Sequence, residues 1–153
     1  MREAAPPGAA FHLLARGVIV RDGRLLVARF RGADHTFLPG GHIEHGESAP
    51  AALARELMEE LHVRAGIGAY RGALEHTWVD GGVRHFEINH CFEVTVPELA
   101  SGATPRSHAE HLAFHWVSVG ELRAHNLQPP QLWTLVPRWL AGDRAPWWGS
   151  TLP

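Results

Sequence analysis

Residues 40–63 read GGHIEHGESAPAALARELMEELHV, and this stretch decides the fold. Its first half is punctuated by glycine, which is typical of a loop. Its second half has no helix breaker after Pro50 and is rich in Ala, Leu, Glu and Arg, the strongest helix formers. Ser48 fits an N-cap, and Pro50 falls in the first turn, where its missing N–H is harmless. The stretch therefore predicts a loop followed by a helix of about four turns.

The predicted helix has an apolar arc and an acidic arc. At about 100° per residue, one arc collects the apolar residues that should face the core, namely Leu53, Ala54, Leu57, Met58 and Leu61. A second arc holds Glu56, Glu59 and Glu60, which are one, three and four residues apart. Ala49 and Ala52 lie among these carboxylates and leave the space in front of them open. The pattern predicts an acidic stripe that faces a pocket.

Such a stripe is either a solvated surface or a metal site. Two carboxylates about 5 Å apart repel by about 3 kcal/mol at an effective dielectric constant of 20. Arg55 is the only basic residue in the helix that could offset this repulsion. A divalent cation would use the same carboxylates as ligands, and oxygen donors suit Mg²⁺ or Mn²⁺. From spacing alone, both interpretations remain open.

The whole stretch resembles the box of the Nudix (MutT-like) hydrolase family. The family pattern is G-x5-E-x7-R-E-U-x-E-E-x-G-U, where U is a bulky aliphatic residue, and the matching positions are Gly41, Glu47, Arg55, Glu56, Leu57, Glu59, Glu60 and Val63. One position departs, since His62 stands where the family has glycine. Glycine there can supply a left-handed turn, a conformation that His tolerates better than a β-branched residue does.

This resemblance covers roughly residues 11–122 and implies a fold and an activity. The implied fold is α/β (α+β), a mixed β-sheet sandwiched between α-helices, with a catalytic loop–helix–loop at residues 40–63. The implied reaction is Mg²⁺-dependent cleavage of a phosphoanhydride bond in a nucleoside diphosphate linked to another group, with Mn²⁺ as a possible substitute. The small-molecule substrate would be an NTP or dNTP, a nucleotide sugar such as ADP-ribose, or a dinucleoside polyphosphate.

The resemblance also assigns roles to residues of the box. The implied metal ligands are Glu56, Glu59, Glu60 and the carbonyl of Gly40. Glu47 would assist the metal or the water, Arg55 would orient the carboxylates, and Glu59 belongs to the catalytic cluster as well. Family members often carry a further acidic residue before a Trp-x4-Glu-Leu segment, which here begins at Trp116. Glu110 occupies that region, where it is either catalytic or an ordinary loop glutamate.

Three residues outside the box are candidates for substrate binding. Arg29 and Arg31 leave a strand close to the glycine loop and either contact a terminal phosphate or stay in solvent. Trp78 either stacks on a base or packs as an ordinary aromatic residue. Two other functions also remain open. One is a nucleotide-binding module of the same fold that has lost hydrolysis, and the other is an isoprenoid diphosphate isomerase, which would need a catalytic cysteine such as Cys91.

Outside the box, turn signals predict two hairpins. Asp22-Gly23 should join two strands between Phe11 and Phe30, and Asp80-Gly81-Gly82 should join strands at residues 65–78 and 83–96. The second of these strands alternates partly, and a polar or aromatic face of it opposite the helix is a candidate lining for the substrate cleft. One face carries Phe86, Ile88, His90, Phe92 and Val94, and the other carries Glu87, Asn89, Cys91 and Glu93. A further strand is expected at residues 112–117, followed by a short helix that begins at residue 120.

Composition narrows the class of protein. The chain has 153 residues with a formal net charge of −2, so we expect a single domain, with residues 1–10 as a flexible N-terminus. The chain has no surplus of basic residues, so its charge gives no indication that it binds DNA. Cys91 is the only cysteine, which excludes an internal disulfide. Without a signal peptide or a membrane-spanning run, we expect a cytoplasmic protein.

The segment 126–153 is rich in proline and tryptophan. Residues 131–140 can form a short amphipathic helix, which we expect to be interrupted near Pro137. The segment holds the tryptophans Trp133, Trp139, Trp147 and Trp148. So many large apolar side chains imply burial, either on the domain itself, which we favour, or against a second subunit in a homodimer.

Overall fold

The computed structural model describes residues 8–99 and 102–153. The elements in chain order are β1 (Ala9–Val18), β2 (Val20–Arg21), β3 (Arg24–Phe30), β4 (Thr36–Phe37), β5 (Gly40–His42), α1 (Ala49–Leu61), β6 (Gly66–Asp80), β7 (Val83–Thr95), β8 (Leu112–Ser118), the 3-10 helix η1 (Val119–Glu121), β9 (Leu127–Gln128), α2 (Leu132–Leu140) and β10 (Trp147–Ser150). In the described part of the chain, no helix is both long and apolar enough to cross a membrane.

The strands form two mixed sheets. The first has the order β10-β6-β7-β1-β5, and the second has the order β2-β3-β4-β9 with β8 paired to β3. β1 runs parallel to β7, from Ala9 opposite Arg84 to Val18 opposite Glu93, and antiparallel to β5. This parallel pairing between segments far apart in the chain places β1 between β7 and the edge strand β5.

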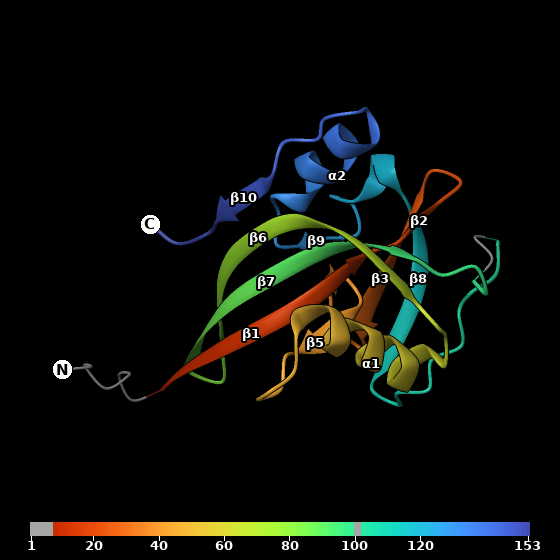
Figure 1. Cartoon of the computed structure of the whole chain (residues 1–153). Coiled ribbons are helices and arrows are strands. Elements are labelled where there is room, and N and C mark those ends of the chain that lie inside the picture. The colour runs from red at the N-terminus through yellow and green to blue at the C-terminus, as the bar shows by residue number, and fades with distance from the viewer. Residues whose placement is uncertain (1–7, 100–101) are drawn as a thin grey trace.

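The two helices lie on opposite sides of the strands (Figure 1). Each helix covers its own apolar core, and alternate residues of β3 point into one core or the other. Leu26 and Ala28 pack with α1, whereas Leu25 and Val27 pack with α2. This alternation follows from the two-residue period of a strand. The α1 side and the α2 side of the strands are therefore distinct layers, and the helix of the box is fixed to one of them.

α1 begins and ends as the sequence predicts. The Ser48 hydroxyl accepts a hydrogen bond of 3.2 Å from the Ala51 N–H, which caps the first turn. At the other end His62 adopts the left-handed conformation, with φ 53° and ψ 40°, and its N–H donates to the Met58 carbonyl. The departure from the family glycine therefore preserves the helix exit.

The apolar face of α1 differs from the prediction at three positions. Ala52, Leu53, Leu57 and Leu61 are the buried residues. Met58 is 41% exposed, and Ala54 is only partly buried and lies outside the core clusters, so the assignment of both residues to the core was wrong. Ala52 is completely buried instead of lying in front of the carboxylates. The core is centred nearer Ala52 and Leu53 than the sequence pattern indicated, because packing against the strands, not periodicity, sets the helix rotation.

The first predicted hairpin is much shorter than expected. Asp22 and Gly23 do form a tight turn with positive φ angles of 50° and 72°, but it joins only β2 and the start of β3. β1, which ends at Val18, takes no part in this ladder and pairs with β5 and β7 in the other sheet. Residues 1–7 of the predicted flexible N-terminus lie outside the described residues, and Ala9 and Ala10 belong to β1.

The segment 126–153 packs on the chain itself. α2 continues through Pro137, so the predicted interruption was wrong, and the Ala141 N–H still donates to the Pro137 carbonyl. Trp147 is buried in the α2-side core and begins β10, an unpredicted strand that pairs parallel with β6. Trp148 remains 65% exposed. The homodimer stays a prediction.

Candidate active site

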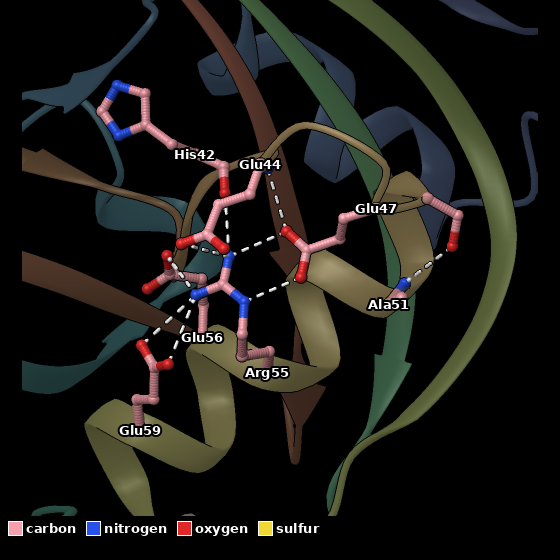
Figure 2. Close-up of polar contacts among 8 residues, drawn as sticks. His42, Glu44, Glu47, Ala51, Arg55, Glu56 and Glu59 are labelled. Carbon is pink, nitrogen blue, oxygen red and sulfur yellow. Dashed lines mark hydrogen bonds and ion pairs between the residues drawn. The ribbon is translucent and has the colours of Figure 1, made fainter.

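Arg55 is the centre of the polar network on α1. Its Nε and Nη2 donate to the two carboxylate oxygens of Glu47 at 2.7 and 2.9 Å. Its Nη1 lies 3.1 Å from Glu56 and 3.3 Å from Glu59, and Nη2 also donates to the His42 carbonyl at 3.1 Å. Figure 2 shows the guanidinium enclosed by these groups. Arg55 thereby ties the loop to the helix and orients three carboxylates at once.

Glu47 is held as an anion. The hydrogen bonds from Arg55 and, next, the Glu44 N–H at 3.0 Å lower the pKa of Glu47 to about 2. A carboxylate with such a low pKa and two occupied oxygens is a poor proton acceptor near neutral pH. In this arrangement Glu47 can fix Arg55 and the loop, and it is less suited to activating water.

Glu60 is in the opposite electrostatic situation. Burial, followed by the charge of neighbouring Glu56 and a hydrogen bond with it, raises the pKa of Glu60 to about 8. Its Oε2 is buried, and no described residue offers it a hydrogen-bond partner. A carboxylate that is buried, partly repelled and short of a partner is expensive to ionise. A bound cation would remove this penalty, so the pair Glu56–Glu60 fits a divalent metal.

Two glycines let the loop approach this pair. A side chain at Gly40, where φ is 141°, would place its Cβ 2.0 Å from the Ala15 carbonyl oxygen of β1. A Cβ at Gly41 would lie 2.5 Å from the carboxyl carbon of Glu56. The Gly-Gly pair therefore keeps open the space in front of the Glu56 carboxylate and lets β5 lie against β1.

Gly41→Ala is expected to reduce metal-dependent turnover about tenfold without unfolding the protein. The new methyl group meets the end of a flexible side chain, so the Glu56 carboxylate shifts while the backbone stays in place. Steady-state kinetics and thermal unfolding would measure the two effects. Gly120→Ala is the matched control, because nothing lies within 4 Å of the added carbon there. Unchanged turnover in Gly41→Ala would contradict this role of Glu56.

The carboxylates are not a preassembled cage. Within residues 8–99 and 102–153, no three His, Cys, Asp or Glu side chains already converge as a metal site. Glu59 is 58% exposed and interacts with Arg55. Glu56 and Glu60 are thus the residues that best fit a cation whose remaining ligands are water or substrate oxygens. The Gly40 carbonyl as a further ligand stays a prediction.

A cavity of about 690 Å³ opens beside the first sheet, and it has the size of a small-molecule site. Glu87 and Asn89 of the polar face of β7 line it, whereas Cys91 and Glu93 of the same face are not among its lining residues. Trp78 lines it too, but its ring stacks on His85 at 3.9 Å and its Nε1 donates to Glu87. The remaining lining residues are Arg16, Phe30, Asp34, His35, Phe37, His76, Thr77, Val79, Asp80, Asn126 and Gln128.

The other three candidates lie outside this lining. Arg31 is exposed, and its Nε donates to the Glu110 carbonyl at 2.8 Å. The Nε of Arg29 is buried without a described partner. Along β3, Arg29 has the same parity as Leu25 and Val27, which pack on the α2 side. Glu110 is exposed, in a loop that reaches the end of α1 through the His108 N–H, which donates to the Glu60 carbonyl at 2.7 Å.

Arg16 is the main cavity residue that sequence reasoning missed. The signal was available, because it is a lone charged residue within the apolar run of β1. Asp34, His35, Asn126 and Gln128 gave no comparable signal. They come from loops and short strands whose meeting depends on the parallel pairing of β4 with β9.

Comparisons with known proteins agree with this fold. A family model described as NUDIX domain matches residues 11–139. The CTP pyrophosphohydrolase of Escherichia coli strain K12 is 34% identical over 119 residues, which cover 75% of this chain and 82% of that protein. The solution structure of the E. coli ORF135 protein has a TM-score of 0.59 and 29% identity, covering 90% of this chain and 94% of that one.

A NUDIX hydrolase structure from Nitrosomonas europaea has a TM-score of 0.61 with 23% identity, covering 90% of this chain and 93% of that one. At this identity it speaks for the fold alone, and it confirms the predicted fold class. The family match spans most of the chain and includes the whole box. The chain belongs to the Nudix hydrolase family.

Proposed function

We propose that this protein hydrolyses a nucleoside triphosphate to the nucleoside monophosphate and pyrophosphate with Mg²⁺ as cofactor and Mn²⁺ as substitute. The observation that carries the proposal is the buried Glu60 carboxylate beside Glu56, which lacks a described partner for Oε2. The similarity to a CTP pyrophosphohydrolase makes CTP and other pyrimidine triphosphates the first substrates to test.

In the proposed reaction a water oxygen attacks the α- or the β-phosphorus of the triphosphate. The phosphoanhydride bond between these two phosphates breaks, which yields the nucleoside monophosphate and pyrophosphate. The bound cation, when present, neutralises charge on the diphosphate and lowers the pKa of the attacking water. Glu56, Glu60 and the Gly40 carbonyl would hold it. Arg55, itself anchored by Glu47, keeps Glu56 and Glu59 in position.

The general base that accepts a proton from the attacking water must be accessible to solvent and must not be held in a short hydrogen-bonded ion pair. Glu59 meets this requirement best, since it is more exposed than Glu47 and its contacts with Arg55 are longer. Glu110 is the second candidate, because its loop contacts the backbone of Glu60 through His108. Substitution of each by Gln would separate them, since loss of the base lowers kcat and removes the acidic limb of the pH profile.

A reactive cysteine is not available for the isomerase alternative. Cys91 is buried, and burial raises the pKa of its thiol to about 12. A thiol of this kind is neither ionised nor accessible near neutral pH. The non-catalytic alternative is disfavoured by the intact carboxylate set of the box.

The proposal is tested by incubating the protein with a nucleotide panel and separating the products by ion-exchange chromatography. The panel contains NTPs, dNTPs, ADP-ribose and a dinucleoside tetraphosphate. We expect CMP and pyrophosphate from CTP with Mg²⁺ and no turnover in excess EDTA. Faster release of AMP from ADP-ribose would overturn the proposed substrate class. No turnover of any nucleotide with Mg²⁺ or Mn²⁺ would overturn the proposed function.

A further inference from the structure

Arg16 connects the cavity with the box through the strand that carries it. It lines the cavity from β1, and its backbone pairs with Gly40 in β5. Its charge interacts attractively with Glu87 on the cavity side and with Glu60 and Glu56 on the side of α1. A ligand that extends from the cavity to these two carboxylates would therefore pass the Arg16 guanidinium.

The guanidinium is held in one orientation. Its Nε donates to the Asn89 Oδ1 at 3.2 Å, its Nη1 donates to the Leu38 carbonyl at 3.2 Å, and it lies 5.2 Å from the centre of the Phe37 ring. Asn89 is only 3% exposed and donates in turn to Glu87 at 3.1 Å. Arg16 thus loses little side-chain freedom on binding a ligand, which favours affinity.

This cation lacks a close anionic partner. No carboxylate of residues 8–99 or 102–153 forms an ion pair with Arg16, whereas Arg55 has several. Its Nη2 has no acceptor among the described residues, since the contacts above use only Nε and Nη1. A guanidinium with a free edge matches phosphate oxygens in geometry and charge. It is the one arginine of the described cavity lining, which otherwise carries Asp34, Asp80 and Glu87 as charged groups.

We propose that Arg16 binds the phosphate next to the nucleoside, the α-phosphate of a triphosphate, through the free edge of its guanidinium. The inference rests on the proposed function, because it takes a nucleotide as the ligand. The nucleoside would occupy the cavity, the α-phosphate would meet Arg16, and the remaining phosphates would extend toward Glu56 and Glu60. Arg16 then contacts the phosphate next to the nucleoside, whereas Arg29 and Arg31 were expected to contact a terminal phosphate.

The test compares binding of CMP with binding of cytidine, measured by isothermal titration calorimetry in EDTA so that no metal contributes. Wild type should bind CMP more tightly than cytidine. Arg16→Gln should weaken CMP binding at least about tenfold and leave cytidine binding within about twofold, because a charge-assisted hydrogen bond is lost. Arg16→Lys keeps the charge but loses the planar guanidinium, so its affinity for CMP should lie between those of wild type and Arg16→Gln. Arg84→Gln, an exposed arginine of the same sheet, should match wild type.

Thermal unfolding checks that each variant is folded, and Arg16→Lys carries the test if Arg16→Gln does not fold. Equal weakening of CMP and cytidine, unchanged CMP binding in both Arg16 variants, or no preference of wild type for CMP would each overturn the inference. The proposed function fails separately. A protein that prefers CMP through Arg16 but hydrolyses no nucleotide would refute hydrolysis and leave the phosphate contact standing.

Discussion

Glu60→Gln is expected to lower Mg²⁺-dependent turnover about 1,000-fold while leaving the metal-free protein at least as stable as wild type. Glutamine keeps the shape of the side chain but offers a cation only a neutral oxygen, and a site that loses a charged ligand loses most of its stabilisation of the developing charge. The same change removes the repulsion between Glu60 and Glu56. Loss of activity together with a gain in stability distinguishes a metal ligand from a structural residue.

The stability gain of Glu60→Gln should depend on pH. The unfolded chain releases the Glu60 proton near pH 4.5, whereas the folded chain retains it up to about pH 8. Folded wild type therefore binds more protons in this interval and loses stability, relative to the unfolded state, as pH rises. Glutamine does not titrate, so the difference in unfolding temperature between the variant and wild type should widen from pH 5 to pH 8 in EDTA.

Steady-state kinetics and thermal unfolding in EDTA would measure both effects. Glu121→Gln, an exposed glutamate at the 3-10 helix, is the control and should behave as wild type. Retained turnover in Glu60→Gln would remove its assignment as a metal ligand. A variant that is inactive because it unfolds would contradict the account of its buried, repelled carboxylate.

Arg55→Met should reduce turnover about 100-fold and lower the unfolding temperature at neutral pH. Methionine retains the aliphatic stem but leaves Glu47, Glu56 and Glu59 without the cation that orients them. Groups that orient metal ligands typically contribute 10- to 100-fold to affinity or activity. Excess Mg²⁺ should restore part of the turnover, since it replaces part of the lost positive charge.

The stability loss in Arg55→Met should disappear in acid. The lowered pKa of Glu47 means that its pairing with Arg55 stabilises the fold above about pH 4.5, and this contribution is lost as pH falls toward about 2. The gap in unfolding temperature between wild type and Arg55→Met should therefore close between those pH values. Arg84→Met is the exposed control. A gap that is independent of pH would show that Arg55 acts through packing alone.

The catalytic stretch could be predicted because its determinants are local. The Ser48 cap, the helix that follows it and the left-handed His62 all depend on residues a few positions apart. The tight turn at Gly81 and Gly82 has the same local origin. By contrast, the hairpin from Phe11 was predicted too long, because nothing in the local pattern indicates that β1 pairs in parallel with β7.

The cavity was predicted only where a single strand carried the signal. The alternation of β7 placed Glu87 and Asn89 on one face but did not decide which face, or which part of it, lines the cavity. Asn126 and Gln128 reach the cavity from a segment more than thirty residues away in the chain. Pro137 likewise shows that the local sequence does not reveal tertiary packing. Its helix packs Leu132 and Val136 into the core, and this tertiary packing outweighs the helix-breaking tendency of proline.

A crystal soaked in Mn²⁺ and measured at the manganese absorption edge tests most directly whether the helix carboxylates hold a cation. The account predicts an anomalous peak bounded by the carboxylates of Glu56 and Glu60 and the carbonyl of Gly40, and no peak there in Glu60→Gln. A wild-type crystal with Glu60 protonated against Glu56 and no manganese beside either carboxylate would contradict it.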